Sequence, residues 1–142
     1  MTKVVAVKIL TTVNIIKCMQ VKIDTREKFH VITIRETKLA ANMTAELDEC
    51  LLPFVKKDIK NVVLNLEDIQ DIDSAAANQL LIIKEHFYGH QSSFVVCNVR
   101  PNVLNLLNDQ DLVEVLNITP TESEAWDIVQ MEEIERELLG GN

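Results

Sequence analysis

Residues 61–78, NVVLNLEDIQDIDSAAAN, contain the stretch that decides the fold. The first six residues, NVVLNL, are apolar enough to predict a strand that is buried on both faces. An acidic loop, Glu67–Asp73, follows, and Ser74 then begins a segment with helical periodicity. The apolar residues of that segment recur along one helical face at Ala76, Leu80, Ile83 and Phe87. A buried strand that runs through a loop into a helix is typical of α/β folds.

Ser74 is the residue of this stretch that could carry chemistry. Its place before the helical run predicts an N-cap, whose hydroxyl accepts a hydrogen bond from a backbone N–H two or three residues on. Backbone N–H groups and the positive end of the helix dipole converge there, so the position can stabilise an anion. Three alanines follow and leave the first turn open to another protein. Many serines at this position only cap their helix, so a purely structural Ser74 stays open at this point.

The rest of the chain extends the pattern to the element order ββαβαβαβα from Met19 onwards. Strands are predicted at Gln20–Asp24, Phe29–Arg35, Asn61–Leu66, Ser93–Val99 and Val113–Ile118. Helices are predicted at Asn42–Lys57, Ser74–Tyr88, Pro101–Asn108 and Thr121–Leu139. Apolar strands that alternate with helices predict the α/β class, with a single domain whose central mixed β-sheet is packed with helices.

Local signals mark the ends and bends of these helices. The stripe on Asn42–Lys57 consists of Leu47, Cys50, Leu51, Phe54 and Val55. Pro53 lies on the other face of that helix and predicts a kink. Gly89 is expected to end the Ser74 helix in the left-handed conformation. Thr121 and Glu124 have the spacing of a capping box at the start of the last helix.

Composition excludes several classes of function. The chain has 142 residues, 47% of them hydrophobic and 25% charged, which suits one soluble domain that needs no metal or disulfide to fold. Of its three glycines only Gly89 lies away from the C-terminus, so a glycine-rich phosphate-binding loop is excluded. A net charge of −8 argues against a nucleic-acid partner, because phosphate backbones attract clustered Lys and Arg.

Three regions are expected along the chain. Residues 1–18 form an N-terminal extension, either an extra strand or a segment upstream of a natural start at Met19. Its apolar part is too short to span a membrane, which takes about 20 residues, so no direct membrane insertion is expected. Residues 19–131 form the main domain, and residues 132–142 form an acidic helix extension and tail.

Cysteine and histidine residues give no metal or catalytic pattern. Cys18, Cys50 and Cys97 are far apart, and an odd number of cysteines without a secretory signal suits a reducing cytoplasm. His86 and His90 have a metal-compatible spacing, but no third ligand is evident near them. We therefore expect no metal and no cofactor.

The end of the chain is strongly acidic. From Thr119 onwards it has seven acids and one base, Arg136. This pattern is typical of a solvated helix face, and the alternative is a binding surface for a basic partner. Met131, Ile134 and Leu138 add a narrow apolar seam that would suit a homodimer contact.

Residues 19–131 resemble the STAS domain, the family of sulfate-transporter domains and bacterial anti-sigma-factor antagonists. The resemblance rests on NVVLNLEDIQDIDSAAANQLL, on SSFVVCNVRPNVLNLL and on Ile118–Ala125 before the last helix. The first stretch is similar to a family pattern of apolar strand, acidic loop, Asp-Ser-Ser-Gly and helix. Asp73 matches the family Asp and Ser74 the phosphorylated serine, whereas Ala75 and Ala76 replace the second Ser and the Gly.

The resemblance implies a partner-switching protein of the bacterial anti-sigma-factor antagonist kind. A partner that is both anti-sigma factor and serine kinase would bind the unphosphorylated chain, phosphorylate Ser74 and be released, and a serine phosphatase would reset the switch. The contact residues implied are Asp71, Asp73, Ser74, Ala75, Ala76 and Asn78. The addition of a methyl at Ala76 would then alter the docking surface.

Two other functions remain open. The chain could be a constitutive STAS subunit that docks on a transporter or signalling assembly, with Ser74 acting only as a cap. An enzyme that uses Asp71, Asp73 and Ser74 is disfavoured, because a nucleophilic serine needs a base in reach and no histidine is nearby.

Overall fold

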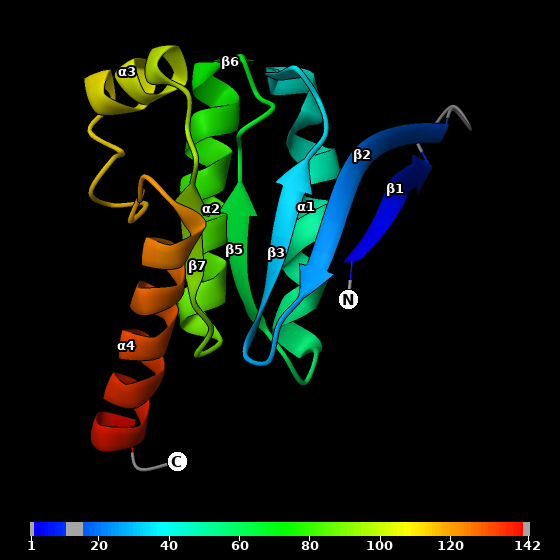
Figure 1. Cartoon of the computed structure of the whole chain (residues 1–142). Coiled ribbons are helices and arrows are strands. Elements are labelled where there is room, and N and C mark those ends of the chain that lie inside the picture. Colours follow the sequence, from blue (N-terminus) through cyan, green and yellow to red (C-terminus); the bar gives the residue numbers. More distant parts are fainter. Residues whose placement is uncertain (1, 11–15, 141–142) are drawn as a thin grey trace.

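The computed structural model of the chain describes residues 2–10 and 16–140 and contains a five-stranded mixed sheet (Figure 1). Its strands are β1 (Thr2–Leu10), β2 (Ile16–Thr25), β3 (Phe29–Ile34), β5 (Asn61–Asn65) and β7 (Phe94–Cys97), in the spatial order β1-β2-β3-β5-β7. The pairs β1–β2 and β2–β3 are antiparallel, and β3–β5 and β5–β7 are parallel. The mixed sheet of the predicted α/β class is therefore confirmed.

Helices cover both faces of this sheet. The helices α1 (Thr44–Leu51) and α2 (Ser74–Gly89) pack on one face, and α4 (Glu122–Gly140) lies across β5 and β7 on the other (Figure 1). Alternate residues of one strand therefore enter different cores. Ile32 packs with the core under α1 and α2, whereas Val31 packs with Ala125 and Val129 of α4. Burial on both faces explains why β3, β5 and β7 are apolar without alternation.

The carboxyl edge of the parallel strands carries the remaining elements. A second, small sheet pairs β4 (Lys38–Leu39) with β6 (Asp71–Ile72) in parallel, so the loop predicted at Glu67–Asp73 contains a short strand. The helix α3 (Pro101–Asp109) follows β7, close to its predicted bounds. The 3-10 turns η1 (Ala41–Met43) and η2 (Leu52–Lys56) flank α1.

The apolar stripes predicted for the two large helices are confirmed. All five stripe residues of the first helix are buried, as is the predicted face of α2. The first helix itself is interrupted, because α1 ends at Leu51 and the 3-10 turn η2 continues through Pro53. A proline has no N–H to donate to the carbonyl four residues earlier, which accounts for the change at this point.

The prediction of a strand directly before the last helix was wrong. Val113–Ile118 forms successive turns instead of a strand, with Leu112 and Leu116 buried four residues apart and Leu116 N bonded to Leu112 O. Asn117 then adopts a positive φ of 53°, and only Thr119 reaches the sheet, through a bridge to Cys97. The observed order therefore has no strand before α4 and gains β1, β4 and β6.

Gly89 is also not the left-handed residue after α2. The helix includes Gly89 and is capped by His90, and the positive φ of 60° falls on Gln91. The hydrogen bond from Ser92 N to Phe87 O closes this turn at 2.9 Å.

The N-terminal extension contributes an edge strand. Residues Thr2–Leu10 form β1, which pairs along its whole length with β2 from Leu10–Ile16 to Thr2–Asp24. Residues 11–15 of the predicted extension lie outside the described residues, and residues 16–18 belong to β2.

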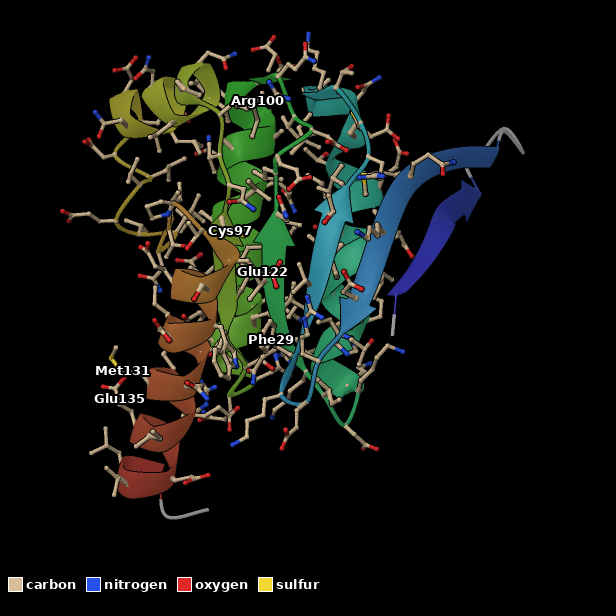
Figure 2. All side chains as sticks on the ribbon, viewed as in Figure 1. Phe29, Cys97, Arg100, Glu122, Met131 and Glu135 are labelled. Atoms are coloured by element: carbon tan, nitrogen blue, oxygen red, sulfur yellow. The ribbon has the colours of Figure 1, made fainter. Side chains whose placement is uncertain are left out.

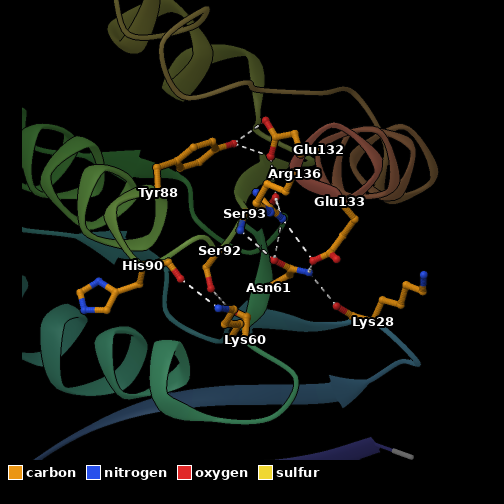
Figure 3. Close-up of polar contacts among 10 residues, drawn as sticks. All are labelled: Lys28, Lys60, Asn61, Tyr88, His90, Ser92, Ser93, Glu132, Glu133 and Arg136. Carbon is orange, nitrogen blue, oxygen red and sulfur yellow. Dashed lines mark hydrogen bonds and ion pairs between the residues drawn. The ribbon is translucent and has the colours of Figure 1, made fainter. Parts of the chain in front are cut away.

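A polar network joins α4 to the ends of β5, β7 and α2 (Figure 3). Glu132 accepts hydrogen bonds from Tyr88 Oη at 2.6 and 2.7 Å and from Ser93 Oγ at 2.5 Å. Glu133 accepts from Asn61 Nδ2 at 2.8 Å and from Arg136 at 3.2 Å. These two acids therefore do not belong to a freely solvated helix face.

The ionisation of Glu133 is favoured by its partners. Burial opposes its charge, but the hydrogen bonds from Asn61 and Arg136 and the charge of Arg136 outweigh burial and lower its pKa. A carboxyl group whose pKa is lower in the folded state stabilises the fold above its unfolded pKa of about 4.3.

We expect Phe87→Ala to be strongly destabilising. Phe87 is fully buried and its ring lies 5.2 Å from that of Phe94, so truncation should cost about 3–5 kcal/mol. Ile82→Ala, on the exposed face of the same helix, should change the free energy of unfolding by less than about 0.5 kcal/mol. Urea denaturation followed by circular dichroism measures both. Equal losses would contradict the assignment of the two faces.

We expect Glu133→Gln to be less stable than the parent chain at pH 7. The parent should lose this advantage as the pH falls from about 4.3 through the lowered pKa of Glu133, because protonation breaks the charge-assisted contacts. The urea midpoints of the two proteins should therefore converge at low pH and constant ionic strength. A constant difference between the midpoints would show that Glu133 does not titrate in this way.

Candidate functional site

Ser74 opens α2 at the edge of the sheet where the parallel strands end. It is the first helical residue, and Asp73 takes the N-cap position with extended torsions of φ −83° and ψ 155°. Ala77 N donates to Asp73 O at 2.9 Å, which is the first hydrogen bond of the helix. The sequence prediction that Ser74 caps the helix was therefore wrong by one residue.

Asp73 has all three of its polar groups engaged in holding the start of the helix. Its N–H donates to Leu39 O at 2.9 Å, its carbonyl accepts from Ala77, and its carboxylate Oδ2 accepts from Ala41 N at 3.0 Å. Within the described residues, the Asp73 side chain makes no capping hydrogen bond to α2. The N–H groups of the first turn are thus left uncapped by it, at the positive end of the helix dipole.

The hydroxyl of Ser74 is exposed and has one defined neighbour. Gln110 Nε2 donates a hydrogen bond to Ser74 Oγ at 2.6 Å. Gln110 is the residue that ends α3, and it is 36 residues from Ser74 in the sequence. The hydroxyl oxygen therefore accepts from Gln110 and keeps its own proton free to donate. Sequence reasoning missed Gln110, and a lone glutamine after a helix carries no signal that could have found it.

The acidic loop before Ser74 is held from both sides. Toward the β4 side, Gln70 N donates to Thr37 O at 2.7 Å, next to the β4–β6 pairing. Toward α3, Arg100 Nε donates to Glu67 O at 2.8 Å, and the Asn102 amide donates to Gln70 O. Figure 2 shows Arg100 at this edge of the molecule. The loop therefore presents its acids on a fixed backbone.

The predicted contact residues divide into a surface group and a buried residue. Asp71, Ser74, Ala75 and Asn78 are exposed, and Asp73 is half-buried. Ala76 is fully buried in the core under α2, so its methyl group cannot touch a docked protein. The expectation that Ala76 alters a docking surface is corrected by this burial. Of the two alanine replacements, only Ala75 changes the surface.

The exposed stripe continues along α2 beyond the predicted residues. Ile82 lies one turn after Asn78 and has 56% of its surface exposed. The contact residues implied by the sequence end at Asn78 and do not include Ile82. An apolar residue on the otherwise polar face of the helical pattern was the signal available. Ser74, Ala75, Asn78 and Ile82 together are called the Ser74 surface below.

The chemistry of this surface is limited to one hydroxyl and nearby carboxylates. Burial raises the pKa of the Cys50 and Cys97 thiols to about 12, so neither is a reactive thiolate. His30 lies away from Ser74, bonded to Thr25 Oγ1 at 3.0 Å and Ile59 O at 2.9 Å, and burial lowers its pKa. No group of three or more potential metal ligands occurs among residues 2–10 and 16–140.

In the part of the chain that the structure describes, no helix is both long enough and apolar enough to cross a bilayer.

Solved structures show the same fold at low sequence identity. A putative anti-sigma-factor antagonist from Thermotoga maritima has a TM-score of 0.65 and 20% identity, over 76% of this chain and 92% of that one. The phosphorylated form of the Bacillus cell fate determinant SpoIIAA has a TM-score of 0.57 and 15% identity, over 77% and 98%. The murine solute carrier 26 family member A9 anion transporter has a TM-score of 0.64 and 12% identity, over 76% and 18%.

A match to a family model identifies the family of the chain directly. The model of the STAS domain matches residues 20–125, which include the sheet from Gln20 in β2 to β7, the Ser74 surface and the start of α4. This chain belongs to the STAS domain family.

Proposed function

We propose that this chain is a bacterial signalling protein of the anti-sigma-factor antagonist kind, switched off by phosphorylation of Ser74. The observation that carries the proposal is the exposed Ser74 hydroxyl, directly after Asp73 at the uncapped start of α2. The structural similarity to SpoIIAA in its phosphorylated form supports it. The chain acts in the cytoplasm as a binding module and kinase substrate, and not as an enzyme.

The partner is an anti-sigma factor with serine kinase activity. In the unphosphorylated state it docks on the Ser74 surface, where Ile82 supplies apolar area and Ala75 permits close approach. The kinase supplies ATP and Mg²⁺. The γ-phosphoryl group of ATP is transferred to Ser74 Oγ, the hydroxyl proton passes to a base of the kinase, and ADP leaves. A serine phosphatase then restores the hydroxyl.

A phosphate on Ser74 changes the surface without unfolding it. Phosphoserine adds about −1.5 to −2 charges at neutral pH. The uncapped N–H groups of the first turn stabilise that charge, so the helix persists. The carboxylates of Asp71 and Asp73 lie beside it in the sequence, and the surface becomes strongly anionic. A partner that fits the neutral hydroxyl is repelled.

Gln110 orients the acceptor in this proposal. Its amide N–H bonds the Ser74 oxygen at 2.6 Å and leaves the hydroxyl proton pointing elsewhere. After transfer, the same amide can donate to a phosphate oxygen. Gln110 is thus a positioning residue that touches Ser74 both before and after phosphorylation.

The first test locates the phosphate. We expect the purified chain, incubated with Mg²⁺-ATP and a lysate of its own cells, to gain one phosphate on Ser74, as mapped by mass spectrometry. Ser74→Ala should abolish that phosphate. Ser123→Ala is the matched control, because Ser123 is an exposed serine in the first turn of α4 and should leave labelling unchanged. Labelling that persists in Ser74→Ala would overturn the site.

The second test measures binding to the kinase recovered as the labelling activity. Ser74→Ala should retain binding, and Ser74→Asp should lose at least about tenfold in affinity through charge repulsion. Equal affinities of the two variants would contradict the charge switch.

The third test examines the apolar contact on α2. Ile82→Ser should weaken kinase binding by about tenfold, because an exposed aliphatic anchor at an interface contributes about 1 kcal/mol or more. Val115→Ser, at a 46% exposed residue outside α2, is the control and should leave binding unchanged. Titration calorimetry measures both. An unchanged affinity for Ile82→Ser would remove the α2 stripe from the interface.

A second candidate function is a constitutive STAS subunit that docks on a transporter or signalling assembly. The similarity to the murine anion transporter favours it, as does the loss of the second motif serine at Ala75. In that case Ser74 remains unmodified in the lysate experiment, and Ser74→Asp leaves assembly intact. The two functions are therefore separated by the same measurements.

A further inference from the structure

The last helix extends beyond the sheet that anchors it. Its N-terminal half is fixed by Ala125 and Val129, which are fully buried against β3, β5 and β7. Its C-terminal turns continue past the N-terminal end of β7 (Figure 1). Leu138 and Leu139 near its end are 78% and 86% exposed. The C-terminal half of α4 therefore has a large surface that the described residues do not cover.

An apolar seam follows the outer side of this helix. Met131, Ile134 and Leu138 are 58%, 56% and 78% exposed, and their spacing of three and four residues places them on one face. Figure 2 shows the Met131 side chain on the side of α4 that points away from the sheet. Seams with this spacing are the contact surface between paired helices, where side chains of one helix fit between those of the other.

The charges around the seam are all negative. Glu124, Asp127, Glu135 and Glu137 are exposed, and none of them forms an ion pair within residues 2–10 and 16–140. The other three acids of α4 are occupied. Glu122 pairs with Arg26 at 3.1 Å, and Glu132 and Glu133 belong to the inner network.

The sole base of α4 is turned inward. Arg136 donates to Ser93 Oγ at 3.0 Å, to Glu133 Oε2 at 3.2 Å and to Asn61 Oδ1 at 3.4 Å. Figure 3 shows this side chain directed into the network and away from the outer face. The outer face of α4 therefore combines an apolar seam with four unpaired carboxylates and no cation.

We propose that this face, the α4 seam, binds a basic amphipathic helix of a partner protein. A helix with apolar residues at heptad spacing would cover the seam, and Lys or Arg residues on its flanks would pair with the four carboxylates. A second copy of this chain fits less well, because it would bring an identical set of carboxylates against the first. The α4 seam lies on the opposite sheet face from α2 and does not depend on the Ser74 surface.

The test uses a synthetic helical peptide and the full chain. The probe has about three heptads with Leu at a and d and Lys at e and g, and its control has the same composition with the heptad order scrambled. Fluorescence anisotropy should show saturable binding of the probe that weakens as salt is raised. The scrambled peptide should bind at least about tenfold more weakly.

Variants locate the binding. Ile134→Ser and Glu135→Lys should each weaken probe binding by about threefold to tenfold, through lost apolar contact and reversed charge. The matched controls, Val115→Ser and Glu85→Lys, lie at exposed positions outside α4 and should have no such effect. Circular dichroism confirms that each variant remains folded.

Two outcomes would overturn the proposal. If the scrambled peptide binds as tightly as the probe, or if Ile134→Ser and Glu135→Lys bind the probe as tightly as the parent chain does, the attraction to the probe is nonspecific. A concentration-dependent dimer of the parent chain in sedimentation velocity, lost in Ile134→Ser, would show that a second copy occupies the seam.

Discussion

The three hydrogen bonds of Asp73 determine how the start of α2, the candidate functional site, is built. Its N–H and carboxylate bind Leu39 and Ala41, which belong to the chain segment between β3 and α1, and its carbonyl starts α2. A carboxylate at an N-cap ordinarily satisfies the first-turn N–H groups of its own helix. Here it satisfies Ala41 instead. The start of α2 is thus fixed in space while its own donors stay free for an anion.

Periodicity predicted the parts of the fold that are buried over many residues. The stripe that includes Leu47 and Phe54, and the face of α2 that includes Phe87, were identified because each repeats over several turns. The strands β4 and β6 pair through only two residues each, which is too short for a periodic pattern, so the sequence did not predict them. Val113–Ile118 has the composition of a strand, but Leu112 and Leu116 are buried at helical spacing and the segment turns.

The sequence predicted the start of α2 to within one residue, but it did not predict which residue from elsewhere in the chain contacts Ser74. Ser74 and its acidic neighbours follow from the order of strand, loop and helix. Gln110 comes from the end of a different helix, and only the three-dimensional packing brings it to Ser74. Ala76 points into the core because it lies on the apolar face of α2 with Leu80 and Ile83. Ala75 is one residue earlier, a rotation of about 100° around the helix, and is exposed.

The burial of Ala76 reduces the number of surface residues that differ from the family pattern. Had both lain on the surface, the chain would have lost a hydroxyl and gained a methyl group at the same interface. Because Ala76 is fully buried, its methyl fills the core with Leu80 and Ile83, and the surface departs from the family pattern only at Ala75. A partner that recognises the backbone and the Ser74 hydroxyl therefore meets one changed side chain.

The two proposed surfaces act independently because of distance and screening. Tyr88 links α2 to Glu132 of α4, but it lies at the far end of α2, about 21 Å along the helix axis from Ser74. The Debye length at physiological ionic strength is about 8 Å, so a charge added at Ser74 is largely screened before it reaches that contact. Communication would require movement of α2 as a rigid body. The buried face of α2, packed through Leu80, Ile83 and Phe87, opposes such movement. Under the proposed function, partner exchange at Ser74 is therefore expected to leave a helix bound at the α4 seam in place.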